Sequence, residues 1–356
     1  MTLLDDDTLR LLAIGAGFLG TGGGGDTAYG LLAARQAVAD HGAPRLLGLD
    51  ELPDDGLLLP TGGMGAPTVG IEKIENGGEG ERLRDAVQRE FGRPVVAVMA
   101  SEIGGSNALT PIGWAARMGL PVVDADGMGR AFPELQMVSM EVAGISPCPA
   151  FITDERGNLS VTRAVDGHWL ERLHRRLTIE LGGSAMTAEY VHTVAQARTA
   201  SIAGSVSLAL AIGRAIDEAD DGPIEALLAA VHGVTLLRGK IVDVERRTRE
   251  GFAFGTVRLD GLGEDRGRTL RIEVQNENLL AFEGERVLAA VPDLISIVDV
   301  ESAHAIATER VRYGQRVAVV ACPCAPVWRT ARGLALTGPQ AFGYDLEPVL
   351  LPAAAP

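Results

Sequence analysis

The chain has 356 residues, of which 46% are hydrophobic and 45 are glycine, and 47 acidic against 32 basic side chains give a formal net charge of −15. This length suits two or three domains with hydrophobic cores, and the acidic excess argues against a nucleic-acid partner. Lysine is nearly absent, because only Lys73 and Lys240 stand among the 32 basic residues. Neither lies in a P-loop, which argues against a Walker nucleotide site and against Schiff-base catalysis.

The N-terminus and the cysteines indicate the cellular compartment of the protein. The first seven residues, MTLLDDD, are acidic where a signal peptide is basic, and no apolar stretch approaches the roughly 18 residues that span a membrane. The three cysteines are an odd number and lack the spacing of a disulfide framework. We therefore expect a cytoplasmic protein with no membrane partner, and we expect it to form a homo-oligomer.

Residues 1–167 alternate short apolar runs with helical segments, which is typical of an N-terminal α/β domain with a mainly parallel sheet. Capping residues and terminal glycines predict four helices, which begin at Asp5–Asp7, Asp26, Glu79 and Thr110. Buried parallel strands are predicted at Leu57–Pro60, Val95–Met99 and Pro121–Val123. The helices should therefore cover a sheet built from these strands.

A glycine-rich polar segment follows each predicted strand. The segments are TGGMGAP (Thr61–Pro67), SEIGGSN (Ser101–Asn107) and DADGMGR (Asp124–Arg130). In open α/β sheets, ligands bind outside the carboxyl ends of the strands, so we expect the three segments to meet at one crevice. Met64 and Gly65, in the first segment, are assigned to substrate binding on this ground.

Residues 168–356 are predicted to form a C-terminal domain, helical over 168–234 and β-rich over 235–350. His168–Leu181 and Ile202–Ala219 are the expected long helices, on either side of a GGSAMT turn (Gly182–Thr187). From Thr235 onward, short alternating strands are separated by turn glycines. This pattern predicts a mostly antiparallel sheet.

A G-x-G-x-x-G pattern occurs at Gly15, Gly17 and Gly20. A dinucleotide-binding fingerprint must follow a strand and open a helix, whereas the preceding residues here predict a capped helix. The following TGGGGD (Thr21–Asp26) would also break the helix that the fingerprint needs. We therefore do not interpret these glycines as a dinucleotide site.

The run of glycines itself is a candidate binding loop. A long bare loop that ends at a helix N-terminus presents backbone N–H groups and a positive dipole to an anion or a polarised carbonyl. The alternative is a flexible connection without a binding role. The residues assigned to substrate binding here are Gly22, Gly23, Gly24, Gly25 and Asp26.

Three acidic residues in the expected crevice are the candidate catalytic groups: Glu102, Asp124 and Asp126. Burial at a strand end raises the pKa of a carboxyl toward the range useful for acid and base catalysis. The alternative is that these side chains cap helices or accept hydrogen bonds from loop amides. If the segment is extended, Asp124 and Asp126 point the same way and could hold a water or a divalent metal, so a metal held by carboxylates stays open.

Four polar side chains are candidate substrate ligands. Arg130 would pair with a substrate carboxylate or neutralise the nearby aspartates, and Asn107 would donate to a ring carbonyl or cap a turn. Gln275 and Asn276 belong to a QNEN run inside an otherwise apolar strand pattern. Such amides need partners, so they either line a site or form the loop of a hairpin.

Taken together, seven motifs resemble the S-methyl thiohydantoin desulfurase family. They are GTGGGGD (Gly20–Asp26), GGMGAPTV (Gly62–Val69), EIGGSN (Glu102–Asn107), VVDADGMGRAFPELQM (Val122–Met137), ELGGSA (Glu180–Ala185), QNEN (Gln275–Asn278) and VPDLI (Val291–Ile295). The resemblance extends over nearly the whole chain. It implies hydrolysis of an S-methylated thiohydantoin ring, a five-membered cyclic-imide type of substrate, to the hydantoin with release of methanethiol, and an association with hydantoinase or oxoprolinase subunits.

This reaction needs groups of the kinds found in the crevice. Water must add to a carbon between two ring nitrogens, which requires a base for the water and an acid for the leaving group. We assign Asp124 or Asp126 as base or water holder, Glu102 as partner acid or base, and Asn107 and Arg130 as substrate-orienting groups. The alternatives are a non-catalytic accessory or binding subunit of a hydantoinase-type or oxoprolinase-type enzyme, and hydrolysis of an oxygen analogue of the ring.

Overall fold

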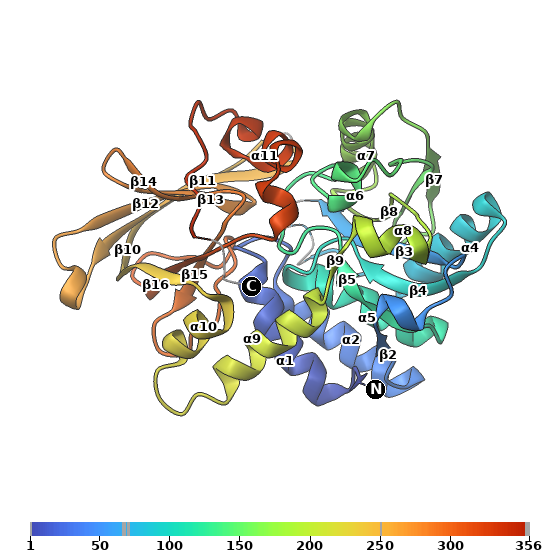
Figure 1. The fold of residues 1–356 in the computed structure, drawn as a ribbon, viewed down its shortest axis with the longest axis horizontal. Helices are drawn as coiled ribbons and strands as arrows, with labels where there is room; N and C mark the ends of the chain where they lie inside the picture. Colours follow the sequence, from blue (N-terminus) through green and yellow to red (C-terminus); the bar gives the residue numbers. More distant parts are fainter. Residues whose placement is uncertain (1, 66–68, 70–71, 250, 353–356) are drawn as a thin grey trace.

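The computed structural model describes residues 2–65, 69, 72–249 and 251–352, so Ala66 and Pro67 of the first glycine-rich segment lie outside the described residues. Two sheets lie on opposite sides of the molecule, with helices beneath and between them (Figure 1). The helices are α1 (Asp6–Leu19), α2 (Thr27–His41), α4 (Glu79–Phe91), α5 (Thr110–Met118), α6 (Ser139–Val142), α7 (Gly167–Glu180), α8 (Val194–Ala200), α9 (Ser205–Asp217), α10 (Pro223–Val231) and α11 (Ala331–Thr337).

The first sheet has the strand order β1-β2-β5-β4-β3-β8-β6-β7, and β9 pairs with β5. Its strands are β1 (Thr2–Leu3), β2 (Arg45–Leu47), β3 (Leu57–Gly65), β4 (Val95–Ala100), β5 (Val122–Asp126), β6 (Ala150–Thr153), β7 (Leu159–Thr162), β8 (Ser184–Ala188) and β9 (Ile202–Ala203). The central strands β2, β5, β4 and β3 are parallel, which confirms the predicted α/β class. On the far side of β3, the strands β8, β6 and β7 continue the sheet in antiparallel fashion.

The predicted turn at Gly182–Thr187 was wrong. Gly182 and Gly183 do turn the chain after α7, with φ of 97° and 89°, but the next residues form β8 and pair with the glycine-rich end of β3. Thr61–Gly65 is therefore strand rather than loop, and residues beyond 167 complete the first sheet. The small residues of β8 carry no alternating pattern that would have predicted this strand.

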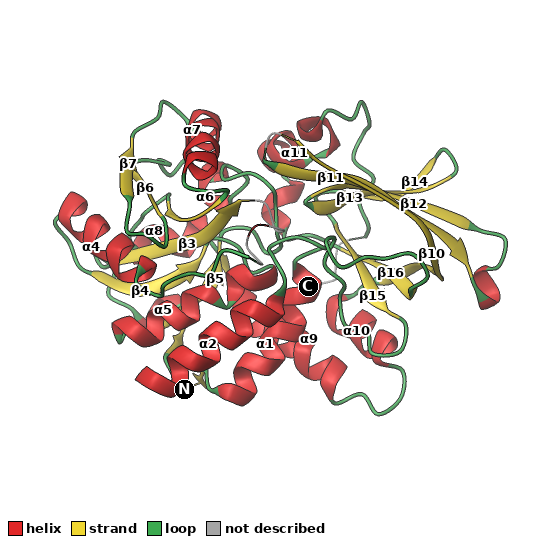
Figure 2. Cartoon of the chain, turned by 180° about the vertical axis from the view of Figure 1, so that it is seen from behind, coloured by secondary structure: helices red, strands yellow, loops and turns green. Residues whose placement is uncertain are grey.

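The helix termini follow the predicted caps. The side chains of Asp5 and Asp26 accept hydrogen bonds from the N–H groups of Thr8 and Ala28, at the starts of α1 and α2. Gly119 ends α5 in the left-handed region, where a residue without Cβ is favoured. Viewed from behind, α2, α1, α9 and α10 lie along the lower edge of the molecule (Figure 2).

Gly15 sets the approach of α1 to α9. A Cβ atom built on Gly15 would lie 1.8 Å from the carbonyl oxygen of Ala209, and one on Gly213 would lie 1.9 Å from the carbonyl oxygen of Leu11. Only glycine allows backbones this close. Gly15 therefore serves helix packing, in agreement with the prediction that the G-x-G-x-x-G pattern is not a dinucleotide fingerprint.

The second sheet is antiparallel throughout, as predicted, with the order β14-β13-β12-β11-β10-β16-β15. Its strands are β10 (Val234–Arg249), β11 (Phe252–Gly261), β12 (Thr269–Gln275), β13 (Glu277–Glu283), β14 (Arg286–Ala290), β15 (Leu294–Asp299) and β16 (Arg316–Cys322). The sheet curls, so that β13 and β14 also contact β15.

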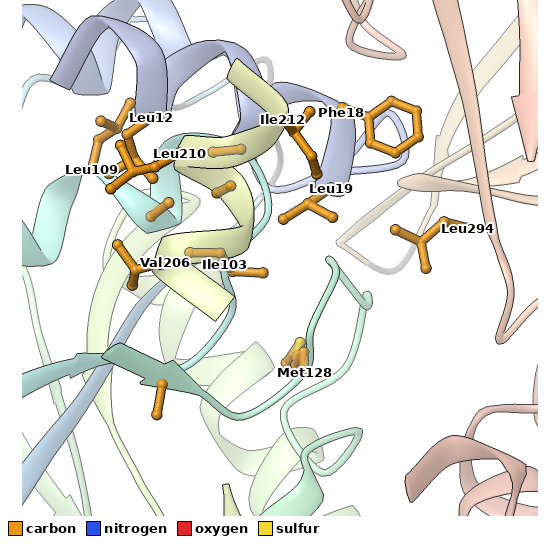
Figure 3. Close-up of a cluster of buried hydrophobic side chains, with 14 of the residues drawn as sticks. Leu12, Phe18, Leu19, Ile103, Leu109, Met128, Val206, Leu210, Ile212 and Leu294 are labelled. Atoms are coloured by element: carbon orange, nitrogen blue, oxygen red, sulfur yellow. The ribbon is translucent and has the colours of Figure 1, made fainter. Parts of the chain in front are cut away.

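One hydrophobic core joins the two sheets. It runs from Leu12 on α1 through Ile103 and Met128 to Leu294 on β15 (Figure 3). At the end of α1, the hydroxyl of Ser296 donates to the carbonyl of Phe18 at 2.8 Å. The glycine loop that follows α1 is thus held between the sheets. Within the described part of the chain, no helix is long and apolar enough to cross a membrane.

Candidate functional site

A pocket of about 480 Å³ lies where the three glycine-rich segments meet, as predicted. Its walls come from the end of β3, the segments after β4 and β5, the loop before α2, β8, and the corner between β12 and β13. Both sheets therefore contribute to it. A volume of this size suits a small-molecule ligand.

Glu102 lines this pocket while being only 7% exposed. Its Oε1 accepts a hydrogen bond from the side-chain amide of Asn107, and its Oε2 accepts one from the N–H of Phe132 at 3.3 Å. Burial raises the pKa of Glu102 to about 8, although these two hydrogen bonds oppose the rise. The carboxyl is therefore a candidate for acid or base catalysis near neutral pH.

Asn107 lines the pocket and positions Glu102. Its Oδ1 accepts from the N–H of Gly63 on β3 at 2.7 Å, which fixes the orientation of the amide. The opposite end of the amide then donates to Glu102. The side chain thus ties the β3 end to the catalytic candidate, a role that differs from the turn cap considered from the sequence.

Asp124 and Asp126 lie two residues apart on β5, and each carboxylate has its own hydrogen-bond partners. Asp124 accepts from the N–H of Ser207 at 3.0 Å and from its hydroxyl at 2.5 Å, so this carboxylate holds the first turn of α9. Asp126 is fully buried, and one of its oxygens accepts from the N–H groups of Ile103, Met128 and Gly129 at 2.7–3.0 Å. Neither side chain lines the pocket, because loop amides and α9 capture the two carboxylates separately.

Asp126 holds the two loops that carry the pocket wall. Because Ile103 follows β4 and Met128 follows β5, the single carboxylate oxygen joins the segment that holds Glu102 to the neighbouring segment. Burial raises the pKa of Asp126 to about 6, with the backbone hydrogen bonds acting in the opposite direction. The structure thus places Asp126 behind the site as a support.

Arg130 is fully buried and does not line the pocket. Its guanidinium donates to the carbonyls of Ala131, Pro292 and Asp293 and to the hydroxyl of Thr21, at 2.7–2.9 Å. It therefore contacts neither Asp124 nor a position open to a substrate carboxylate. Its contacts join the segment after β5 to the segment before β15 and to the glycine loop.

The glycine loop faces two pockets. Gly24, Gly25 and Asp26 line the large pocket, whereas Gly22 and Gly23 line a second pocket of about 230 Å³ together with Gly25 and Asp26. Asp26 caps α2 and also pairs with Arg310 at 2.9 Å, so its charge is already matched. Only part of the predicted loop therefore reaches the site that contains Glu102.

The loop is pinned against the segment after β4. The carbonyls of Gly24 and Gly25 accept from the N–H groups of Asn107 and Ser106 at 3.3 and 3.1 Å. A Cβ on Gly24 would lie 2.2 Å from the carbonyl oxygen of Gly104, so the close approach requires glycine. The N–H groups of Gly24 and Gly25 have no acceptor among the described residues, which leaves two donors at the pocket wall.

The QNEN run forms a corner and also lines the site, so both interpretations of it hold. Gln275 pairs with Glu277 across the corner, and Asn276 between them has a φ of 56°. Asn276 lines the pocket, as do Met64 and Gly65 at the end of β3. Gln275 is absent from the lining among the described residues.

Two buried pocket acids were missed from the sequence. Glu277 is 2% exposed and Glu189, just after β8, is 1% exposed. Each has an Oε2 atom without a hydrogen-bond partner in the described part of the chain. Burial raises the pKa of Glu189 to about 7, opposed by hydrogen bonds from Thr187 and Ser101. Glu277 belongs to the QNEN run, which the sequence had already indicated as a possible part of a site, whereas Glu189 lies in no such motif.

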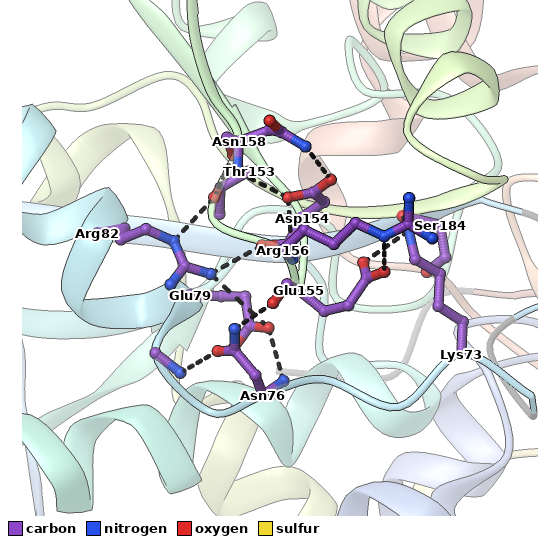
Figure 4. Close-up of polar contacts among 11 residues, drawn as sticks. Lys73, Asn76, Glu79, Arg82, Thr153, Asp154, Glu155, Arg156, Asn158 and Ser184 are labelled. Atoms are coloured by element: carbon purple, nitrogen blue, oxygen red, sulfur yellow. Dashed lines mark hydrogen bonds and ion pairs between the residues drawn. The ribbon is translucent and has the colours of Figure 1, made fainter.

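Of the residues that the structure describes, two basic ones line the pocket, and both already have partners. Lys73 donates to the carbonyls of Leu181 and Ser184 at 2.5 and 2.6 Å and pairs with Glu155 at 2.9 Å (Figure 4). Arg175 pairs with Glu171 at 2.7 Å. Among the described residues, no group of three or more His, Cys, Asp or Glu side chains is arranged to hold a metal ion.

Comparison with known proteins shows the family of this chain and a similar solved structure. The family model described as "S-Me-THD-like, N-terminal domain" matches residues 7–164, and the "S-Me-THD-like, C-terminal domain" model matches residues 165–351. A crystal structure of a protein from Chromobacterium violaceum is similar, with a TM-score of 0.82 and 25% sequence identity over 98% of this chain and 100% of that chain. No curated protein sequence matches the chain.

Proposed function

The chain belongs to the S-Me-THD-like family, and on this premise we propose that it hydrolyses a five-membered S-methylated thiohydantoin to the hydantoin, with release of methanethiol. The observation that carries the proposal is the carboxyl of Glu102, which is buried, oriented by Asn107 and open to a small-molecule pocket. General-base hydrolysis needs such a group within reach of a bound water.

The pocket suits a flat, mostly uncharged ring. The strand end at Gly62–Gly65 and the loop at Gly24 and Gly25 present backbone without side chains, so a planar ligand has room to lie against them. Met128 and Phe132 add apolar surface on the side of the β5 segment. Lys73 and Arg175 are paired with acids, so the other polar groups of the described lining are amides, hydroxyls, carboxyls and backbone groups.

The chemistry follows from the same groups. Glu102 takes a proton from water as the oxygen attacks the ring carbon that bears the S-methyl group, and its raised pKa makes it a stronger base than an exposed carboxylate. The unpartnered N–H groups of Gly24 and Gly25 lie close to the N-terminus of α2 and are suited to stabilise negative charge that develops on the ring.

The test is turnover of S-methyl thiohydantoins by the purified protein, with hydantoin measured by liquid chromatography and methanethiol by gas chromatography. We expect Glu102→Gln to lower kcat/KM by about 100- to 10,000-fold, the usual contribution of a general base. Asp124→Asn is the matched control and should stay within about twofold of the unchanged protein, because asparagine retains the oxygen that accepts from Ser207. Full activity of Glu102→Gln would refute this site.

Two other outcomes would redirect the proposal. Tight binding of the ring without turnover would favour an accessory or binding subunit of a hydantoinase-type or oxoprolinase-type enzyme. Ring opening of an oxygen analogue would favour cyclic-imide hydrolysis. The same assay is repeated with a chelator. Loss of turnover that added divalent ion restores would show that the carboxylates act as metal ligands.

A further inference from the structure

Glu277 is a buried acid at the site that the proposed chemistry does not yet use. It is the first residue of β13, it lines the same pocket as Glu102, and it is 2% exposed. The two sheets therefore each bring a buried carboxyl to this pocket, Glu102 from the first and Glu277 from the second.

The residues around Glu277 leave space for its carboxyl, and one of the two carboxyl oxygens has no hydrogen-bond partner among the described residues. A Cβ built on Gly23 would lie 1.8 Å from Oε1 of Glu277, so the glycine loop leaves the space that this oxygen occupies. The other oxygen, Oε2, has no partner among the described residues. Burying a polar atom without a partner is unfavourable, so such a group in a pocket calls for a ligand or a chemical role.

The chain on both sides of Glu277 is fixed. Asn276 exchanges two hydrogen bonds with Ala253, each 2.8 Å long, and its carbonyl accepts from the hydroxyl of Thr308 at 2.8 Å. On the other side, the N–H of Asn278 donates to the carbonyl of Thr21 at 2.8 Å. The corner therefore holds Glu277 at the pocket wall.

We propose that Glu277 is the second catalytic carboxyl of the site and acts as the proton donor that complements Glu102 as base, an inference that rests on the proposed function. In the first step, water loses a proton to Glu102 and its oxygen bonds to the ring carbon. The electron pair of the C=N bond moves to the ring nitrogen, which takes the proton of Glu277.

In the second step, the new hydroxyl returns a proton to Glu277 and becomes the carbonyl of the hydantoin. The C–S bond breaks, and the sulfur leaves with the proton held by Glu102, as methanethiol. Water has then added one oxygen to the ring, and both carboxyls have recovered their starting forms. No oxidant or reductant is needed.

The hydrogen bonds decide which carboxyl is the base. Glu102 accepts from Asn107 and Phe132, and both contacts favour its ionised form, whereas Oε2 of Glu277 has none. Burial raises the pKa of Glu277 well above its ordinary value, and the negative charge of Glu102 raises it further. The cations that face Glu277, Arg130 and Arg175, act in the opposite direction. The remaining proton of the pair therefore stays on Glu277.

The test compares Glu277→Gln and Glu277→Asp with Glu283→Gln, a control on the same strand that lies outside the pocket lining and pairs with Arg268. Glu277→Gln should lower kcat/KM by about 100- to 10,000-fold. The rate of the unchanged protein should rise with pH as Glu102 ionises and fall at higher pH as Glu277 loses its proton. Glu277→Gln should remove only the high-pH fall, and Glu277→Asp should retain it at a reduced rate.

Binding of the hydantoin product is the second readout. Calorimetry should give a Kd for Glu277→Gln close to that of the unchanged protein, because glutamine keeps the size of the side chain. A Glu277→Gln variant with the full rate, or with a lower rate but an unaltered pH profile, would overturn the inference and leave the proposed function standing. An unchanged protein without turnover would overturn the proposed function and the inference with it.

Discussion

The close approach of α1 to α9 at Gly15 can be tested by its effect on stability. Gly15 and Gly17 lie two residues apart on α1, yet their surroundings differ. A Cβ on Gly15 would meet the carbonyl oxygen and carbon of Ala209 at 1.8 and 2.6 Å, whereas one on Gly17 would meet nothing nearer than 3.8 Å. Gly15→Ala and Gly17→Ala are therefore a matched pair in a single helix.

The two substitutions should change the free energy of unfolding in opposite directions: Gly15→Ala should lower it and Gly17→Ala should raise it. A carbon and a carbonyl oxygen need about 3.3 Å between them, so Gly15→Ala must push α1 and α9 apart by more than 1 Å. Overpacking of this kind costs about 1–3 kcal/mol or more, and the higher helix propensity of alanine returns about 1 kcal/mol. Gly17→Ala gains the propensity alone. Because both variants gain the propensity, we expect their free energies of unfolding to differ by the overpacking cost, about 1–3 kcal/mol or more, with Gly17→Ala the more stable.

Urea unfolding followed by the fluorescence of the three tryptophans measures both variants. The same samples with NAD and NADH test the interpretation of the motif, and neither cofactor should move the unfolding midpoint. Equal stability of Gly15→Ala and Gly17→Ala would refute the packing argument. A midpoint raised by a dinucleotide would refute our interpretation of the G-x-G-x-x-G pattern.

Three further predictions concern the buried polar groups. Burial raises the pKa of Glu102 to about 8 and that of Glu189 to about 7. Between about pH 4.5 and pH 8 these two groups therefore hold more protons in the folded chain than in the unfolded chain. The free energy of unfolding should fall as the pH rises through this range. Urea titrations at pH 5 and 8 measure this fall, which Glu102→Gln should make shallower; a rise in stability would contradict the argument. Arg130→Met leaves carbonyls of two segments without their donor and should lower the free energy of unfolding by about 3–5 kcal/mol, as thermal unfolding would show, whereas a neutral effect would disprove the supporting role. Gly23→Ala should displace the carboxyl of Glu277 rather than backbone and lower kcat/KM at least about tenfold, so an unaffected rate would mean that the position of this carboxyl does not matter.

The sequence determined the local features of this protein. The starts of α1 and α2 follow from Asp5 and Asp26, and the end of α5 from Gly119, because capping joins groups only a few residues apart. The parallel centre of the first sheet and the antiparallel second sheet follow from hydrophobic patterns of similar range. The meeting of the glycine-rich segments follows from the rule that parallel strands end at one edge.

Only the tertiary structure decided which acids face the pocket. Asp124 and Asp126 are two residues apart, but α9 takes one carboxylate and loop amides take the other. Glu277 lines the same pocket as Glu102 because the core around α1 brings the second sheet against the first. The partners of a buried carboxyl are set by packing between distant segments, whereas local hydrogen bonds and sterics act over a few residues, so the sequence predicted the crevice but not its second carboxyl.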